Sequence, residues 1–105
     1  MTAPAPRVDF DAINRAALAR LPDLLARWLP GGRTEGQEYT PLNPRRGDHR
    51  PGSFRINLRT GRWSDFATGD AGGDPISQGA YLFGLSQVES ARRFADMLGV
   101  RFDGR

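Results

Sequence analysis

The chain has 105 residues, a formal net charge of +3 and no cysteine. A domain of this length buries roughly 65% of the surface that its unfolded chain would expose, and the lack of cysteine excludes disulfides and thiolate metal ligands and leaves His49 as the single nitrogen ligand for a metal. The N-terminal sequence MTAPAPRVDF lacks the apolar core of a signal peptide and no apolar run approaches the ~20 residues of a membrane span, so we expect a cytoplasmic protein with no membrane partner.

The N-terminal part of the chain predicts a helical segment behind a flexible tail. We expect residues 1–9 to be this tail and residues 10–105 to form a single domain. Apolar residues recur with the period of a helix over residues 10–29, either as one helix or as a pair broken near Pro22. The Pro-Gly-Gly sequence that follows ends the helix, and residues 33–37 are typical of an exposed linker.

The middle of the chain predicts a small antiparallel sheet. Residues 38–42 have the pattern of a short strand, at an edge of the sheet because of Pro41. Residues 53–58 alternate between apolar and polar, and a second run follows Thr60 and Gly61, which is the pattern of a tight hairpin. A two-residue loop would give this hairpin one apolar and one basic face. The apolar face is Phe54, Ile56, Leu58 and Trp63, and the basic face is Arg55, Asn57, Arg59, Arg62, Ser64 and Phe66.

Positive charge is concentrated in this hairpin and in the turn-rich loop that enters it, residues 43–52. Residues 45–62 hold six arginines and one aspartate, a local charge of +5 that leaves −2 for the rest of the chain. The predicted loop places Arg59 directly opposite Arg62, and a bound anion would relieve their repulsion. Such a basic stripe is typical of proteins with phosphate-rich partners, although a solvated arginine-rich surface would give the same pattern.

Residues 63–74, WSDFATGDAGGD, combine three aspartates with three glycines. A phosphate-binding loop is excluded, because it needs a lysine and a serine or threonine directly after its last glycine. Asp65, Asp70 and Asp74 could hold Mg²⁺, but Asp74 is better explained as a helix cap and Asp70 as a turn residue. Serine-based catalysis would depend on His49 alone. We therefore expect a binding module with no catalytic residue, metal or other cofactor.

Two helices complete the predicted domain. Asp74 followed by Pro75 is a strong start signal for a helix that ends at Gly84. Ser86 begins a second helix that closes at Gly99. The apolar face of the second helix is predicted to be Val88, Ala91, Ala95 and Leu98, with Phe94 beside it. The whole pattern predicts an α+β domain, in which a helical segment precedes a small antiparallel sheet and two helices follow it.

The order of these motifs is similar to that of a known family. NPRR, PGSFRINL, RTGRW, DFATG, GGDPI and AYLFGLSQVESARRFADMLG follow one another between residues 38 and 100. They resemble the N-terminal zinc-binding domain of bacterial and phage DNA primases, above all the divergent versions that precede a Toprim catalytic domain in phage and plasmid primase-helicases. The resemblance implies a zinc-ribbon-like hairpin core and a role in engaging template DNA beside a catalytic domain.

The zinc ligands of that family are missing from this chain. Asn43 stands where the first cysteine would be, Arg46 or Gly47 near the histidine, and Asp65 and Thr68 at the paired cysteines. A structural zinc contributes on the order of 10 kcal/mol to the folding of small zinc domains. In compensation, we expect the N-terminal helical segment to pack on the sheet and side-chain hydrogen bonds from Asp65 and Thr68 to hold the former zinc knuckle.

The resemblance and the charge pattern together predict a DNA-binding module of a replication protein. We expect it to bind single-stranded DNA rather than duplex, because no predicted helix carries a basic face that could read a groove. The predicted contacts are Arg45, Arg46 and Arg50 from the loop, Arg55, Arg59 and Arg62 from the hairpin, Asn57 as a polar contact and Phe66 as a stacking platform. Trp63 is assigned to the core.

A protein-interaction role is the alternative function. Loss of zinc can accompany loss of template recognition, which would leave a scaffold that docks onto a polymerase or a helicase. For the DNA-binding module, the expected protein partner is a primase catalytic domain or a helicase. In both cases we expect the chain to be a monomer without enzymatic activity of its own.

Overall fold

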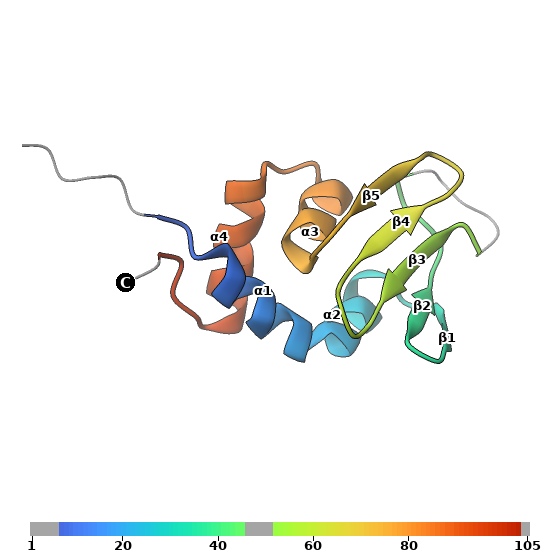
Figure 1. Cartoon of the computed structure of the whole chain (residues 1–105), viewed down its shortest axis with the longest axis horizontal. Coiled ribbons are helices and arrows are strands. Elements are labelled where there is room, and N and C mark those ends of the chain that lie inside the picture. Colours follow the sequence, from blue (N-terminus) through green and yellow to red (C-terminus); the bar gives the residue numbers. More distant parts are fainter. Residues whose placement is uncertain (1–6, 46–51, 104–105) are drawn as a thin grey trace, which may run out of the picture.

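Four α-helices and a five-stranded antiparallel sheet form the described part of the chain, which is residues 7–45 and 52–103 of a computed structural model. The helices are α1 (Phe10–Ala19), α2 (Leu21–Trp28), α3 (Pro75–Phe83) and α4 (Gln87–Leu98), and the strands are β1 (Arg33–Glu35), β2 (Glu38–Thr40), β3 (Phe54–Asn57), β4 (Trp63–Asp65) and β5 (Asp70–Gly72). Figure 1 shows α1, α3 and α4 toward one end of the molecule and the sheet toward the other, with α2 between them. This is the α+β class predicted from the sequence.

The N-terminal helical segment is a pair of helices, which is one of the two predicted arrangements. Asp9 caps α1, since its carboxylate accepts a hydrogen bond from the backbone N–H of Ala12 at 3.1 Å. The helix breaks at Arg20. Pro22 lies in the first turn of α2, where the N–H that proline lacks would have no helical partner.

The core has two clusters, and α2 contributes buried residues to both of them. Ile13 of α1 lies in a buried cluster with residues of α3 and α4. Leu21 and Leu25 of α2 pack instead in a cluster with the strand residues Phe54 and Ile56. The prediction that the helical segment packs on the sheet is therefore correct for α2, whereas α1 packs mainly against α3 and α4 and reaches the sheet cluster through Leu18 near its C-terminal end.

The strands β1 and β5 are not predicted by the sequence pattern. The expected linker at residues 33–37 contains β1, which pairs with β2, and the glycine-rich residues expected to form only a turn contain β5, which pairs with β4. Glu, Asp and Gly have low strand propensity, so pairing with a neighbour creates both strands. The edge position predicted for residues 38–42 is also wrong, because β1 flanks β2, which ends at Thr40 before Pro41.

The hairpin of β3 and β4 has a longer turn than the predicted two-residue loop. Ile56 pairs with Trp63. The side-chain Oδ1 of Asn57 accepts hydrogen bonds from the backbone N–H groups of Arg59 and Thr60, both at 2.9 Å. These two bonds hold the turn and set the register of the strands.

The observed register keeps each side chain on its predicted face, because it differs from the predicted register by an even number of residues. Phe54, Ile56 and Trp63 are buried in the core, as expected. Arg59, however, lies in the turn and not opposite Arg62. The predicted like-charge pair is therefore wrong, and the argument for an anion between these two arginines does not hold.

The helices α3 and α4 begin and end where the sequence predicts. Asp74 caps α3 by accepting the N–H of Ser77 at 2.8 Å, and the Ser77 hydroxyl donates back to the Asp74 carbonyl at 2.8 Å. Ser86 caps α4 through its Oγ. Gly84 and Gly99 end the two helices in the left-handed conformation, with φ of 66° and 69°.

The buried face of α4 agrees with the prediction except at its first position. Ala91, Phe94 and Ala95 are buried, whereas Val88 is 46% exposed. Ser90 is buried in its place and donates a hydrogen bond from its hydroxyl to a carbonyl of α3 at 2.7 Å. This bond pulls a small polar residue of the first turn against α3, which leaves Val88 at the surface.

The described part of the predicted tail contacts the C-terminal segment. Val8 forms an antiparallel bridge with Asp103, and the backbone N–H of Asp9 donates to the carbonyl of Phe102 at 3.0 Å. These contacts bring the two ends of the described chain together beside α1 and α4 (Figure 1). None of the helices in the described residues is long and apolar enough to cross a membrane.

Gln78 of α3 is fully buried, and neither Nε2 nor Oε1 of its side chain has a hydrogen-bond partner among the described residues. An unsatisfied buried polar group costs about 1–3 kcal/mol. We expect Gln78→Met, which keeps the length of the side chain, to raise the free energy of unfolding by about 1–2 kcal/mol. Urea unfolding measures this as a higher midpoint with an unchanged slope.

The matched control for this substitution is Gln87→Met, at an exposed position of α4. It should change the free energy of unfolding by less than about 0.5 kcal/mol. A loss of stability in Gln78→Met would contradict the interpretation that the buried amide is a cost to the fold.

Candidate nucleic-acid interface

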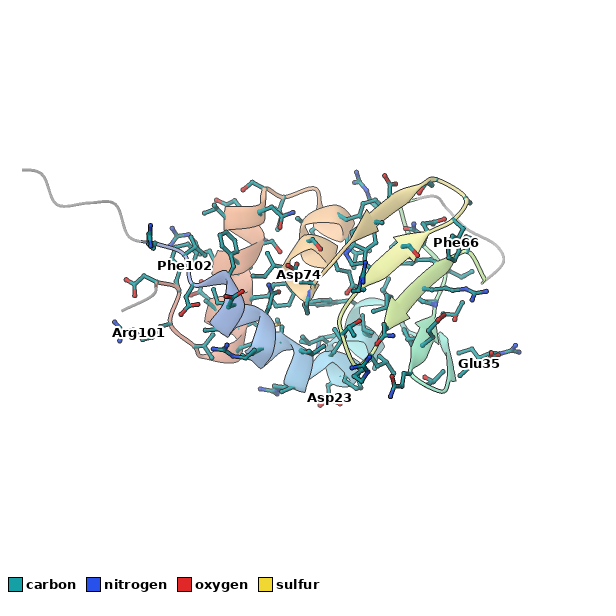
Figure 2. The ribbon with its side chains drawn as sticks, in the orientation of Figure 1. Asp23, Glu35, Phe66, Asp74, Arg101 and Phe102 are labelled. Atoms are coloured by element: carbon teal, nitrogen blue, oxygen red, sulfur yellow. The ribbon has the colours of Figure 1, made fainter. Side chains whose placement is uncertain are left out.

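One face of the sheet is open, because the strands bury their apolar side chains on the other face. Phe54 of β3 is 0% exposed, whereas its neighbour Arg55 is exposed on the opposite face. Figure 2 shows Phe66 and Glu35 at the sheet end of the molecule, away from Phe102 at the helical end. The open face therefore lies apart from the contact between the chain ends.

Strand pairing arranges the side chains of this open face in rows. Arg55 of β3 pairs with Ser64 of β4, which pairs with Ala71 of β5. The next row consists of Glu38, Asn57 and Arg62. Long charged side chains therefore lie beside small ones on this face.

A shallow groove of about 420 Å³ crosses these rows. Gly72 cannot carry a side chain here, because a Cβ would lie 2.4 Å from both Trp63 Nε1 and Ser77 Oγ. Trp63 is 5% exposed, as its predicted place in the core requires, and its Nε1–H donates to Ser77 Oγ at 3.0 Å. The residues that line the groove are Glu38, Arg55, Asn57, Arg62, Trp63, Ser64, Phe66, Ala71, Gly72 and Gly73.

Arg55 is held across the groove by three contacts. Its guanidinium lies 5.6 Å from the centre of the Phe66 ring, and its Nε donates to the carbonyl of Gly52 at 3.0 Å. Its Nη1 lies 3.6 Å from Oε1 of Glu38. Both charged side chains are about half exposed, so this ion pair is weak and open to replacement by a phosphate.

Arg62 and Phe66 are both exposed in the groove. Arg62 is exposed and makes no ion pair with any described residue. Phe66 is 71% exposed, and its backbone N–H is fixed to the carbonyl of Ser53 at 3.0 Å. A free cation and a flat exposed ring on one surface match the contacts that single strands make, phosphate neutralisation and base stacking.

Asn57 and Arg59 have structural contacts in addition to their predicted role. Asn57 lines the groove, but its Oδ1 is occupied by the turn described above. Arg59 lies in that turn, where its Nε donates to Oε1 of Gln37 at 3.2 Å, and it does not line the groove.

Of the predicted loop arginines, Arg45 is the one within the described residues, and it does not line the groove. Arg45 lies on the other side of the sheet, with its guanidinium 5.9 Å from the centre of the Tyr81 ring of α3. Arg46 and Arg50 lie outside the described residues. Of the predicted contacts, the groove thus brings together Arg55, Asn57, Arg62 and Phe66.

Acidic residues also contribute to the open face, which sequence reasoning missed. A second hollow of about 360 Å³ adjoins the groove and is lined by Arg33, Glu35, Glu38, Thr40, Gly52 and Arg55. Arg33 and Glu35 form an exposed ion pair at 3.6 Å. The face is therefore mixed in charge rather than wholly basic. The sequence did contain a signal for Glu38. In the strand of Glu38, Tyr39 and Thr40, successive side chains point to opposite faces, so that Glu38 lies on the face opposite to that of Tyr39.

The positions that correspond to two zinc ligands in the primase resemblance are joined by a direct hydrogen bond. Nδ2 of Asn43 donates to Oδ2 of Asp65 at 2.7 Å, and both residues are buried. Asn43 Nδ2 also donates to the hydroxyl of Tyr81 at 2.9 Å, and Asp65 Oδ1 accepts the N–H of Ala67 at 2.8 Å. Sequence reasoning identified both positions but not the bond between them.

Thr68 completes the turn that Asp65 begins. Its hydroxyl accepts the N–H of Asp70 at 3.1 Å and donates to the Asp65 carbonyl at 3.5 Å. The predicted hydrogen bonds from Asp65 and Thr68 are therefore present. The Mg²⁺ alternative is not supported, since Asp74 caps α3 and the described residues contain no group of three or more His, Cys, Asp or Glu that could hold a metal ion.

The groove combines two arginines, an exposed phenyl ring and a carboxylate over a floor of small residues. Neither a scan against protein-family models nor a search of curated proteins finds a match to the chain. The chemistry of the groove suits an extended anionic ligand with flat rings, which has phosphates for the arginines and a ring for Phe66.

Proposed function

We propose that the chain is a non-catalytic DNA-binding module of a primase-like replication protein, that it acts in the cytoplasm as a monomer, and that it holds single-stranded template DNA in the groove. The observation that supports this most is the placement of Arg62 and the Arg55–Phe66 pair along one groove. Proteins that bind single strands combine cations that follow the backbone with aromatic rings on which bases stack.

The exposed ring favours single-stranded over duplex DNA. Phe66 offers a stacking surface that only an unpaired, unstacked base can use, because the bases of a duplex already stack on one another. The groove is also shallow, and it is built on strands of only three or four residues. A short segment of single strand fits this surface better than a rigid double helix.

The bond between Asn43 and Asp65 supports the likeness to primase zinc domains. It joins the segment that follows β2 to the end of β4, which are the two segments that a zinc ion would join in that family. We infer that hydrogen bonds replace the metal and keep the hairpin in position for template binding. The catalytic steps of priming would then be carried out by a partner, which is either a primase catalytic domain or a catalytic domain linked to a helicase.

Salt dependence of binding tests this function. We expect a labelled single strand of about ten nucleotides to bind weakly, with a dissociation constant that rises steeply with salt between about 50 and 200 mM. Two phosphate contacts give a slope of about 1.4 in a plot of log Kd against log salt, and each further arginine contact adds about 0.7. Fluorescence anisotropy measures this slope.

A hairpin duplex of the same sequence is the control for this titration and should bind more weakly than the single strand. A flat response to salt, or equal binding of the duplex, would contradict the proposal.

A protein-docking role is the second candidate, and a hollow among the helices favours it. This hollow has a volume of about 230 Å³ and is lined mainly by apolar residues of α2, α3 and α4. Phe83 and Met97, which line it, are 53% and 39% exposed. If DNA does not bind, a scaffold that docks onto a polymerase or helicase through this hollow becomes the better explanation.

A further inference from the structure

Three polar side chains lie side by side at one end of the groove, on three adjacent segments of the sheet. Glu38 of β2 pairs with Asn57 of β3. The backbone N–H of Asn57 donates to the carbonyl of Arg62, just before β4, at 2.7 Å. All three side chains line the groove. We call them the polar row.

The chemistry of each member of the polar row is well defined. Glu38 in its ionised form only accepts hydrogen bonds, and Arg62 only donates them. The Asn57 amide has a fixed orientation, because its Oδ1 accepts two backbone N–H groups of the turn at 2.9 Å. Its Nδ2 makes no hydrogen bond within the described residues and can only donate. The row therefore presents an acceptor, a donor and a second donor in order across the strands.

We propose that the polar row reads the edge of an unpaired base and selects cytosine over thymine. Cytosine presents the N4 amino donor and then the N3 and O2 acceptors, which is the complement of the row. Thymine presents the O4 acceptor and then the N3–H donor, so that like groups would face each other at Glu38 and at Asn57. Adenine, with an amino donor beside an acceptor, satisfies the first two positions.

The place of Glu38 supports this assignment. A carboxylate in a groove that binds a phosphate backbone repels the ligand, and its half-exposed ion pair with Arg55 at 3.6 Å offsets little of that repulsion. A base that donates a hydrogen bond to the carboxylate offsets this repulsion. A base that has no donor at this position leaves the repulsion in place. Carboxylate side chains accept from cytosine N4 in this way.

This inference rests on the proposed function, because a base reaches the polar row only if a single strand lies in the groove. The experiment compares the binding of labelled oligo-dC, oligo-dA and oligo-dT of about ten nucleotides to the full chain at one low salt concentration. We expect oligo-dC to bind about fivefold more tightly than oligo-dT, with oligo-dA between them. Glu38→Gln, whose amide can donate as well as accept, should bind oligo-dC and oligo-dT equally.

The matched control is Glu35→Gln, which removes the same charge from the adjacent strand, directly opposite Glu38. Because Glu35 is outside the polar row, this variant should bind both oligonucleotides more tightly and keep their ratio. Equal binding of the three oligonucleotides by the unaltered chain, or an unchanged ratio in Glu38→Gln, overturns the base reading alone. Failure of every oligonucleotide to bind overturns both the base reading and the proposed function.

Discussion

Replacing Asp65 by alanine is expected to lower the free energy of unfolding by about 3 kcal/mol. The carboxylate is 1% exposed and accepts hydrogen bonds from Asn43 Nδ2 and from the N–H of Ala67. The substitution leaves both donors without this partner in a buried region, and removing one member of a buried polar network costs more than the network contributes as a whole. Because small domains are stable by only about 5–15 kcal/mol, a large share of the stability would be lost. Urea unfolding followed by circular dichroism measures the change.

Asp70→Ala is the matched control, since Asp70 pairs directly with Asp65 across β4 and β5 but is exposed. It should change the stability by less than about 0.5 kcal/mol. Exchanging the two groups, with Asn43→Asp and Asp65→Asn together, restores a donor and an acceptor and should recover about half of the loss. Stoichiometric zinc in the purified protein, or a large loss of stability with a chelator, would contradict the interpretation that hydrogen bonds replace a metal.

Reversing the charge of the two groove arginines, with Arg55→Glu and Arg62→Glu together, is expected to weaken binding of single-stranded DNA by about 100-fold at low salt. The change removes two cations from the groove and adds two carboxylates beside Glu38, so that the groove would repel a phosphate backbone. The slope of log Kd against log salt should also fall. Both arginines are exposed, so the fold should tolerate the substitutions.

Arg15→Glu with Arg27→Glu is the control for net charge, because these arginines are exposed on α1 and α2 and the total charge changes equally. Binding should then weaken by less than about threefold, the effect of long-range repulsion alone. If both double variants lose affinity to the same extent, the chain binds DNA through its overall charge and the groove is not the site.

The helical part of the fold was predictable because its signals are local. Asp74 with Pro75, Ser86, and the two closing glycines each act within one turn of the helix that they begin or end. A break near Pro22 was one of the two arrangements that the sequence left open, but the different directions of α1 and α2 depend on packing with α3 and α4, which lie far along the chain.

The sheet and the groove depend more on distant contacts, and sequence reasoning found only part of them. The face on which Arg55 and Phe66 lie follows from alternation, which survives a slip of register by an even number of residues. The strands β1 and β5 hold residues that disfavour strands and exist through pairing. The hydrogen bond from Asn43 to Asp65 joins residues that are 22 positions apart, and no local sequence pattern predicts it.

Ser77 joins the two halves of the molecule through one hydroxyl group. Its Oγ accepts the indole N–H of Trp63 beneath the groove and donates to the carbonyl of Asp74 at the start of α3. The shape of the groove therefore depends on α3, which lies on the opposite side of the sheet. Selection for a more stable helix and selection for a different ligand would act on the same atom, so neither trait is free to drift without the other.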